Sequence, residues 1–550
     1  MINNLILLLQ IILGHLAVLP MPTLAAVFLS IDCGSSDSFT DANNITWVRD
    51  HPYITSGVNQ IVQSADNSSV ARQYTTRRVF PIRKKNCYSI GEVGKGERVL
   101  LRAYFYYGIY RDETSSAPTF DLQFDGNHWA TVDNSSADPF YYEAIYLTRF
   151  ASISVCVAKN EGYPDDVPFI SAIEVRSLHL GMYRGVDSTY PLYIYDRSNY
   201  GENETVRYPK DKYDRIWYPL PSAKDFVTVK NNISISVKNL PDEPPETVLR
   251  TALYNQNSSD SYLCITFSNL TANMYTIFYF SELLKLNSSK QRSFSIYMNG
   301  ENISPQIIPP HKKGLEYNFT TNKSASGDEY NARYCLNRTA NSTLPPIINA
   351  LEMYEIGSVL TDGTDIKHVK ALSLLQKFFV QLQDWSGDPC LPNGFPWDWV
   401  QCTDSDTPQI IALNLSNYGL QGSLPDFSAL DTLQIIDLHN NSLSGEIPSF
   451  LGNFPNLTTL NLANNNFSGS IPSSITDNTE LKFDATGNMY LLCTSNQSCS
   501  NSRNATLSTP PPPGTLILPP PTNSYSHSKI SKKFSIINGI VFLLVVLVYY

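Results

Sequence analysis

The chain has 550 residues, a formal net charge of −10 and a pI near 5.4. Its 40 lysines and arginines are scattered along the sequence, which excludes the clustered basic surface of a nucleic-acid-binding protein. Aromatic residues make up 12% of the chain, with 33 tyrosines, and this favours β-rich domains whose surfaces stack on sugars or peptides.

The N-terminus predicts a secretory signal peptide over residues 1–25. Residues 5–19 form an apolar run, and a Pro-Met-Pro segment and the small residues Ala25 and Ala26 follow it. The alternative is an uncleaved anchor. The apolar run is short for that, because a membrane-spanning helix needs about 20 residues.

Asparagine sequons indicate a glycosylated, secreted surface. The pattern Asn-X-Ser/Thr occurs at 19 positions. In the oxidising secretory compartment the nine cysteines can form disulfides, and the odd count leaves one over. The asparagines that we expect to carry glycans are Asn44, Asn67, Asn134, Asn203, Asn232, Asn257, Asn269, Asn287, Asn302, Asn318, Asn337, Asn341, Asn456 and Asn504.

Residues 26–358 carry the pattern of β-sandwiches. Short runs rich in Val, Ile, Tyr and Phe recur between clusters of Gly, Asn, Asp and Pro. The strands predicted in the first half are residues 26–34, Arg98–Tyr107, Phe120–Phe124, Ile153–Val157 and Phe169–Val175.

The second half of this region repeats the first. Residues 168–175 correspond to 346–353 at an offset of 178, and residues 120–126 correspond to 294–300 at an offset of 174. These offsets favour tandem sandwiches, over 26–185 and 186–358, rather than a chance similarity of strand sequences.

The cysteines of this region follow the same duplication. Cys156 matches Cys335 at an offset of 179, and Cys87 corresponds to Cys264. Each copy could therefore hold its own disulfide, with Cys33 left over. Alternatively, these are buried strand cysteines that never pair, and the sequence leaves both possibilities open.

Four motifs in this region resemble the plant malectin-like extracellular region. The resemblance covers most of residues 27–355 and implies a tandem pair of β-sandwiches. Animal malectin, which this region is similar to, is a lectin for glucosylated N-glycans, so the resemblance also implies a carbohydrate ligand. The motifs are Ser30–Gly34, Arg83–Tyr88, Arg207–Trp217 and Ser342–Ala350.

Carbohydrate binding by stacking needs exposed aromatic rings beside hydrogen-bonding polar groups. One segment of the first sandwich is rich in both, although most aromatic residues in such runs belong to a core. The ligand-binding candidates are Tyr104, Tyr106, Tyr107, Tyr110, Asp121 and Trp129, with Asp125 nearby.

Residues 359–409 predict a helix followed by a disulfide-closed cap. Thr364 or Asp365 can cap a helix over residues 364–383, and His368 on this helix is expected to be a surface side chain. The Gly-Asp-Pro-Cys sequence at Cys390 starts the cap, with Cys402 as the expected disulfide partner. The apolar face predicted for the helix consists of Val369, Leu372, Leu375, Phe378, Phe379 and Leu382.

Residues 410–500 predict a leucine-rich-repeat solenoid. Leu415, Leu438 and Leu462 recur at intervals of 23 and 24 residues, which is typical of the plant extracellular repeat. Three full repeats lie near 410–432, 433–456 and 457–480, with a partial fourth over 481–492. We expect Asn441 to bond to backbone inside the bend, and Cys493–Cys499 to close the C-terminal cap.

The last 50 residues predict a stalk and a membrane anchor. Residues 501–533 are rich in proline, and Phe534–Tyr550 is a largely apolar run that predicts a hydrophobic helix. This run is interpreted as a single-pass span or as part of a GPI-anchor signal. The fold class is therefore mainly β, with tandem malectin-like sandwiches, a short repeat solenoid and a C-terminal hydrophobic helix.

The domain order resembles the outer half of plant malectin-like leucine-rich-repeat receptor kinases. The motifs of a kinase are not found in the sequence. We therefore expect a protein on the extracellular side of the plasma membrane that binds glycan, cell-wall polysaccharide or peptide and signals only through a receptor kinase or co-receptor. The alternative is a truncated decoy or co-receptor scaffold without glycan binding.

An enzyme that acts on wall polysaccharide is disfavoured. Such an enzyme needs two converging carboxylates, which the sequence does not reveal. No metal-ligand or Ser/His/Asp pattern stands out, and the eight histidines are scattered. We expect no catalytic residues, no metal, no cofactor and no nucleic-acid partner.

Overall fold

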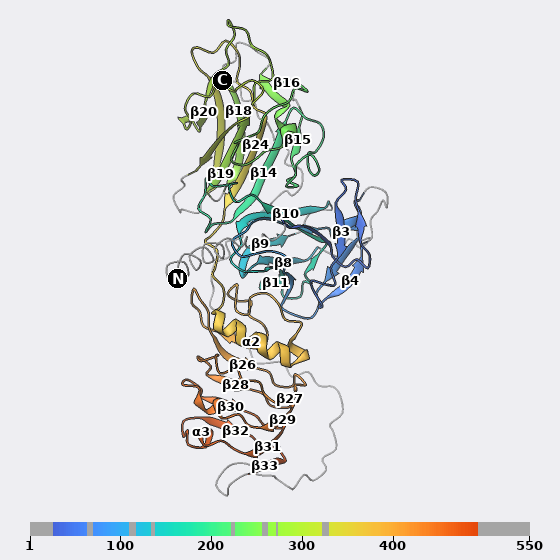
Figure 1. Ribbon diagram of the computed structural model, residues 1–550, viewed down its shortest axis with the longest axis vertical. Coiled ribbons are helices and arrows are strands. Elements are labelled where there is room, and N and C mark those ends of the chain that lie inside the picture. The colour runs from blue at the N-terminus through green and yellow to red at the C-terminus, as the bar shows by residue number, and fades with distance from the viewer. Residues whose placement is uncertain are drawn as a thin grey trace, which may run out of the picture.

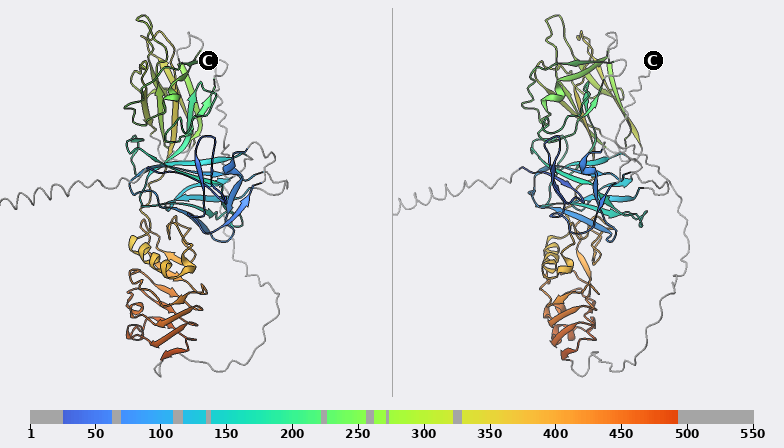
Figure 2. Two further views of the ribbon diagram at one scale, coloured as in Figure 1. Left: turned by 45° about the vertical axis from the view of Figure 1, so that its right-hand side comes forward. Right: turned by 90° about the vertical axis from the view of Figure 1, so that its right-hand side faces the viewer.

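The computed structural model describes residues 26–62, 70–108, 117–133, 138–221, 226–255, 262–270, 273–321 and 329–492. Three units follow one another along the long axis, and we call them sandwich 1, sandwich 2 and the repeat stack (Figure 1). Sandwich 1 lies in the middle, although the repeat stack follows sandwich 2 in the sequence. Figure 2 shows the same order from two further sides.

Sandwich 1 packs two four-stranded sheets around one apolar core. The first sheet holds, in order, β1 (Phe28–Asp32), β13 (Ala172–Leu178), β7 (Arg98–Phe105) and β10 (Phe140–Leu147). The second holds β6 (Lys85–Ile90), β11 (Ile153–Lys159), β8 (Thr119–Phe124) and β9 (Asn127–Asp133). Short strands flank them: β2 (Phe39–Thr40), β3 (Thr46–Arg49), β4 (Val58–Ile61), β5 (Thr76–Val79) and β12 (Phe169–Ile170), with the turn η1 (Arg72–Tyr74).

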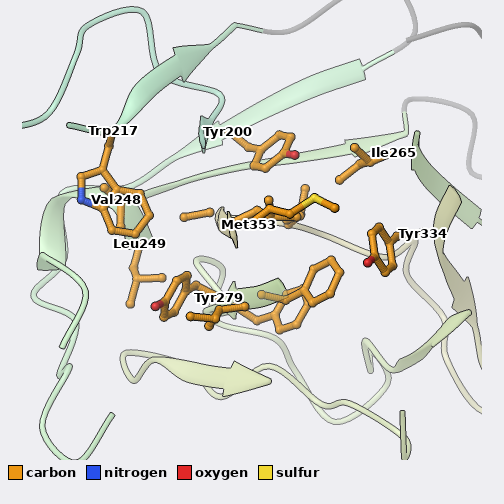
Figure 3. Close-up of a cluster of buried hydrophobic side chains, with 14 of the residues drawn as sticks. Tyr200, Trp217, Val248, Leu249, Ile265, Tyr279, Tyr334 and Met353 are labelled. Carbon is orange, nitrogen blue, oxygen red and sulfur yellow. The ribbon is translucent and has the colours of Figure 1, made fainter. Parts of the chain in front are cut away.

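Sandwich 2 repeats this arrangement strand for strand, which confirms the predicted tandem copies. Its first sheet holds β14 (Leu192–Tyr200), β24 (Ala350–Ile356), β19 (Met274–Phe280) and β22 (Leu315–Thr320). Its second holds β18 (Tyr262–Leu270), β23 (Tyr330–Arg338), β20 (Phe294–Met298) and β21 (Glu301–Asn302). Trp217, Tyr279, Tyr334 and Met353 are among the side chains that fill its core (Figure 3). Peripheral elements are β15 (Tyr218–Leu220), β16 (Phe226–Lys230), β17 (Thr251–Asn255) and η2 (Glu246–Leu249).

The two sandwiches share one continuous sheet. Strands β10 and β14 pair through Ala144 with Tyr193 and Ile145 with Leu192, so the first sheets of both copies join edge to edge. This pairing removes two exposed sheet edges. It also makes the pair of sandwiches a single framework rather than two tethered domains.

The cysteines resolve the two alternatives that the sequence left open. Cys87–Cys156 joins β6 to β11, and Cys264–Cys335 joins β18 to β23, at equivalent places in the two copies. Cys33 is a buried free thiol. The predicted Cys390–Cys402 disulfide is also present, whereas Cys493 and Cys499 lie outside the described residues.

The repeat stack places one short parallel strand from each repeat side by side. These are β26 (Ile410–Asn414), β28 (Ile435–Asp437), β30 (Thr459–Asn461) and β32 (Lys482–Asp484). A second set lies on another side of the solenoid: β27 (Gln421–Gly422), β29 (Ser442–Glu446), β31 (Asn466–Ser470) and β33 (Tyr490–Leu492). The turns η4 (Ser449–Asn453) and α3 (Ser473–Thr476) connect them.

An asparagine ladder runs inside the stack, as predicted for Asn441. Its side-chain nitrogen donates to the carbonyls of Leu415 and Leu438 at 2.8 and 2.9 Å, and its oxygen accepts from the amide of Leu420 at 2.9 Å. Asn465 and Asn488 make equivalent bonds in the following repeats. Each asparagine therefore satisfies backbone groups of two neighbouring repeats.

The cap covers the first repeat with a helix, a turn and a strand. Helix α2 (Ile366–Phe378) and turn η3 (Val380–Leu382) precede β25 (Val400–Cys402), which pairs antiparallel with β26. Asp365 caps α2 by accepting from the Lys367 amide, so the second of the two predicted caps is the one used. The helix is shorter than predicted, and Phe378 at its end is 59% exposed rather than part of the apolar face.

The prediction that His368 is a surface side chain is wrong. His368 is fully buried, and its Nδ1 accepts from the amide of Ile410 at 2.8 Å while Nε2 lies 3.2 Å from Asp431. It lies on the same helix face as Leu372 and Leu375, which are four and seven positions further along. Its ring links α2 to the first strand of the stack.

The segments predicted for secretion and membrane anchoring lie beyond the described residues, whereas most predicted glycan acceptors lie within them. The signal peptide, the stalk and Phe534–Tyr550 lie outside the described residues, and no described helix is long and apolar enough to cross a membrane. Asn67, Asn134, Asn257 and Asn504 also lie outside them. Of the other ten predicted glycan acceptors, nine are exposed and Asn337 is half-buried, so glycosylation stays a prediction that their positions permit.

Candidate ligand-binding site

The tyrosines proposed for sugar stacking are not gathered on one surface. Tyr104 and Tyr106 are only 2% and 4% exposed, and Tyr107 is half-buried beneath the Arg77 guanidinium. The Tyr104 hydroxyl donates to Glu174 at 2.5 Å. Tyr104 and Tyr106 therefore present no ring face to solvent in this structure, and Tyr110 lies outside the described residues.

The polar candidates of sandwich 1 also have internal partners. Asp121 accepts from Thr131 and Asn160, both at 2.9 Å, and Asp125 accepts from Tyr146. Burial would raise the pKa of Asp121, but hydrogen bonds from His128, Asn160 and Thr131 hold it below its usual value. Trp129 belongs to the sandwich core, whereas Tyr104 belongs to a separate cluster beside Trp47. The structure does not bring these residues into one site.

A buried ionic network lies where the two sandwiches meet. Arg102 on β7 bonds to Glu143 on β10 and to Glu174 on β13, each at 2.5 Å. Glu143 also bonds to Arg197 on β14 at 2.6 Å, so one carboxylate links the two sandwiches. The remaining members are Arg176, Arg207, Asp211, Asp214, Arg215 and Glu352.

The charges of this network balance at five arginines and five carboxylates. Burial alone would raise the pKa of Glu174, but Arg176, Arg102 and Arg207 hold it well below its usual value. Glu143, beside Arg197 and Arg102, likewise has a lowered pKa, so both glutamates stay ionised, and the arginines offset the loss of their hydration. The segment over 207–217, one of the four motifs that resemble malectin-like proteins, supplies four of the ten groups.

A pocket of about 950 Å³ opens beside this network. Five segments line it: residues 179–185 between the sandwiches, residues 209–212, residues 237–246, Tyr275 on β19 and Asn318 on β22. The walls include Pro209, Pro241, Pro244 and Pro245, and lysines lie among the lining residues.

The floor of the pocket carries a buried hydroxyl group without a partner. Among the described residues, the Tyr275 hydroxyl makes no hydrogen bond, and the Tyr275 side chain is less than 2% exposed. Asp242 also lines the pocket, and one of its carboxylate oxygens shares a hydrogen bond with the Glu316 carboxyl group, which lies behind the lining. The other Asp242 oxygen accepts from the Tyr183 amide.

Asp242 and the neighbouring Glu316 both have raised pKa values. Burial, together with the charge of Asp242, raises the pKa of Glu316 to about 9. Burial raises the pKa of Asp242 to about 6. Glu316 is therefore protonated at neutral pH and can donate a hydrogen bond, whereas Asp242 is mainly ionised.

The raised pKa of Glu316 in the folded chain predicts that the stability of the protein depends on pH. In the unfolded chain Glu316 ionises near its ordinary pKa of 4.5, so between that value and about 9 the native state holds one more proton. The free energy of unfolding should then fall as the pH rises, by up to about 1.4 kcal/mol per pH unit. Urea unfolding between pH 6.5 and 7.5 measures this slope. In this window Asp32, Asp125, Asp196 and Asp242, with pKa values raised to about 6, have lost their protons, and Lys85, with a pKa lowered to about 8, still keeps its proton.

The Glu316→Gln variant should flatten this dependence because glutamine cannot ionise. Glu301→Gln on the exposed strand β21 is the matched control and should keep the wild-type slope. An unchanged slope in Glu316→Gln would contradict the assignment of the extra proton to Glu316.

The sequence indicated this pocket only indirectly. Its lining comes from five segments that are up to 139 residues apart, from His179 to Asn318, and none carries a recognised binding motif. The one local signal is the Pro-Asp-Glu-Pro-Pro run over 241–245, which predicts an irregular surface loop.

Comparison with protein families matches residues 31–356 to the malectin-like domain and residues 431–476 to two copies of the leucine-rich repeat. Fold and matches together define the class as a receptor-like protein with malectin-like and leucine-rich-repeat domains. More than half of the chain matches the first model, and the chain belongs to the malectin-like domain family. Neither matched family is an enzyme family.

Similar curated proteins are receptor-like kinases of Arabidopsis thaliana. The LRR receptor-like serine/threonine-protein kinase IOS1 is 32% identical over 426 residues, which is 74% of this chain and 46% of the relative. The probable LRR receptor-like serine/threonine-protein kinase MEE39 is 33% identical over 411 residues, covering 72% and 45%. The chain thus spans about half the length of the curated relatives it matches.

Solved structures share the fold of the sandwich pair. The ANX2 ectodomain from Arabidopsis thaliana has a TM-score of 0.53 and 19% identity, covering 60% of this chain and 97% of that one. The complex of the plant peptide RALF23 with FER and LLG2 contains a chain with a TM-score of 0.51 and 17% identity, covering 60% and 96%.

Proposed function

We propose that this chain is a receptor-like protein on the extracellular side of the plasma membrane that binds carbohydrate, cell-wall or peptide ligands. The observation that carries this proposal is the pocket of about 950 Å³ beside the ionic network that joins the two sandwiches. Pockets of this kind are the usual place for ligand binding. The sandwiches would recognise the ligand, and the repeat stack would present its parallel strands to a peptide or co-receptor.

The comparisons support a binding role without enzymatic activity. The matched families are the malectin-like domain and the leucine-rich repeat, and the relatives named above are receptor-like kinases that carry this pair of domains over the matched region. One solved structure of the same fold contains a peptide and a second protein, LLG2, beside FER. By analogy we propose that this chain passes its signal to a receptor kinase or co-receptor.

The test is a screen of the full-length, glycosylated chain on arrays of glycans, wall oligosaccharides and secreted peptides, with heat-unfolded chain as the control. Retention of one ligand class by the folded chain alone is the expected result. Capture of a receptor kinase from plant membranes without retention of any array ligand would support the alternative, a co-receptor scaffold without glycan binding. Turnover of a wall oligosaccharide would overturn the non-enzymatic role.

A further inference from the structure

We propose that the outer face of helix α2 is the contact of a symmetric dimer, in which two copies of this chain pack their α2 helices antiparallel. The residues that define this outer face are Ile366, Lys370, Leu374, Lys377 and Phe378. The inference goes beyond ligand binding and does not depend on it, because it concerns the cap of the repeat stack rather than the pocket.

The outer face of α2 is apolar although it lies in solvent. Ile366, Leu374 and Phe378 are 60%, 45% and 59% exposed, and Val380 just after the helix is 68% exposed. Only 21 large apolar side chains are exposed in the described residues, and these four all lie between positions 366 and 380. The opposite face of the helix is buried in the core of the stack. A helix that is apolar on both sides is normally covered on both, so we expect a partner on this face.

The sequence leaves this face free of glycans. Predicted glycan acceptors are spread over both sandwiches and the repeat stack, but residues 359–409 contain no Asn-X-Ser/Thr pattern. A bulky glycan on the cap would keep another protein chain away from the helix. The cap therefore offers a protein partner an open approach.

The side chains of the outer face form a row that matches its own reverse. Positions 366, 370, 374 and 378 are four residues apart and therefore lie along one ridge of the helix. Such a ridge packs into the groove of a second helix. If the second helix runs antiparallel, Ile366 lies opposite Phe378 of the partner subunit, and Lys370 lies opposite Leu374 of the partner subunit. Each contact then occurs twice, as a two-fold axis requires.

The start of α2 is acidic. Asp365 caps the helix, and its amide donates to the carbonyl of Pro408 at 2.9 Å. The exposed Asp404 and Asp406 belong to the loop that leads to Pro408. Three carboxylates therefore lie near this end of the helix.

The middle and the end of the outer face are basic. Lys370 and Lys377 are exposed, whereas Lys367 bonds to Asp431 at 3.1 Å within the chain. An antiparallel pair brings the acidic start of each helix toward the lysines of the other, and a parallel pair would place lysine beside lysine. The charges therefore favour the antiparallel arrangement.

The place of α2 in the molecule suits two chains in one membrane. Figure 1 shows the helix running across the long axis, and in both views of Figure 2 it lies at the margin of the molecule. The two-fold axis of an antiparallel helix pair is perpendicular to both helices. It can therefore run along the long axis, so that both copies point the same way, as the predicted anchor at Phe534–Tyr550 requires.

The size of the contact predicts a weak dimer. A helix of 13 residues is about 20 Å long, and one pair of such helices buries less than the standard interface of about 1,200–2,000 Å². We therefore expect a dissociation constant on the order of 10–100 µM in solution. Anchoring in one membrane would raise the local concentration and with it the fraction of dimer.

Sedimentation equilibrium of the full, glycosylated chain in a density-matched detergent measures this association. Phe378→Glu should raise the dissociation constant about tenfold or more and leave the melting temperature unchanged, because Phe378 is exposed. Ile308→Glu is the matched control, since Ile308 in sandwich 2 is 50% exposed and lies outside the cap. This variant should dimerise like the wild type. Equal dissociation constants for the two variants, or a wild-type chain that stays monomeric up to about 500 µM, would contradict the proposal.

Cysteine cross-linking of the full chain on plant cells tests the direction of the helices. Two differently tagged copies, one with Ile366→Cys and the other with Phe378→Cys, should form a disulfide-linked pair, and either variant alone should form far less. Cys33 is buried and stays out of this reaction. Linkage of each variant mainly to itself would overturn the antiparallel arrangement. If no copies are linked and Phe378→Glu instead loses a different captured protein, the face belongs to that protein and the dimer is wrong, while the proposed ligand binding stands.

Discussion

Replacing Arg197 by methionine is expected to lower the free energy of unfolding of the sandwich pair by about 3–5 kcal/mol. Arg197 is fully buried and bonds to Glu143 at 2.6 Å, Glu352 at 2.7 Å and the Tyr354 hydroxyl at 2.8 Å. Methionine fills similar space without charge, so Glu143 and Glu352 would lose a counter-ion in a medium where neither can be hydrated. The substitution removes an ion pair that joins the two sandwiches, because Glu143 belongs to sandwich 1 and Arg197 belongs to sandwich 2.

Urea unfolding followed by tryptophan fluorescence measures this change. Lys230→Met is the matched control, since Lys230 is 57% exposed and bonds to Glu202 at 3.1 Å. Removal of that surface pair should cost less than about 1 kcal/mol. Equal effects of the two substitutions would show that the buried network does not hold the sandwiches together.

The parts of the fold that could be predicted from the sequence have short-range signals. The repeat stack has a period of 23–24 residues, and Asn441 has one structural role at a fixed place in it. The duplication of the sandwiches was visible because equivalent strands keep similar sequences. The disulfides were left open because strand order in space, which places Cys87 opposite Cys156, depends on pairing across the sheet.

The candidate ligand-binding residues do not lie on one surface, and the burial of strand β7 explains why the sequence suggested that they would. In a half-buried strand, alternate side chains face the core and solvent, and an aromatic residue on the solvent side can be recognised. Strand β7 is buried on both faces along its whole length, with the core on one side and the ionic network on the other. Tyr104 therefore points away from the core and is still inaccessible.

The shared sheet and the pocket have no short-range signal. The pairing of β10 with β14 involves only two residue pairs, and nothing in either strand distinguishes them from other edge strands. The pocket depends on this pairing, because it positions residues 179–185 beside the 237–246 segment. A site assembled from such distant segments becomes visible only in three dimensions.

Replacing Gly387 by alanine is expected to release the repeat stack from sandwich 1. Gly387 has φ +75°, and a Cβ there would lie 2.5 Å from Cys87 Sγ and 3.0 Å from Cys156 Sγ. The cap therefore rests directly on the disulfide of sandwich 1. Around this contact, Lys85 Nζ donates to the carbonyls of Asp388 and Leu391 at 2.7 and 2.9 Å, and Ser386 donates to the Cys87 carbonyl at 2.6 Å.

Two costs add at this position. Alanine in the left-handed region costs about 1–2 kcal/mol wherever it occurs. The clash adds a second cost, because a disulfide between paired strands cannot move aside as a flexible side chain can. Movement of the cap would also break the hydrogen bonds of Lys85. Burial lowers the pKa of Lys85 to about 8, so exposure to water would stabilise its ammonium group, and the carbonyls of Asp388 and Leu391 would lose their donor.

Gly419→Ala separates these two costs. Gly419 has φ +68°, and a Cβ there would meet no atom within 4 Å, so this variant carries the backbone cost alone. Small-angle scattering of the full chain should show a wider spread of shapes for Gly387→Ala than for Gly419→Ala, and calorimetry should show the larger loss of stability. If the two variants scatter and melt alike, the disulfide contact does not fix the angle of the stack, and the hydrogen bonds of Lys85 and Ser386 must hold the joint without it.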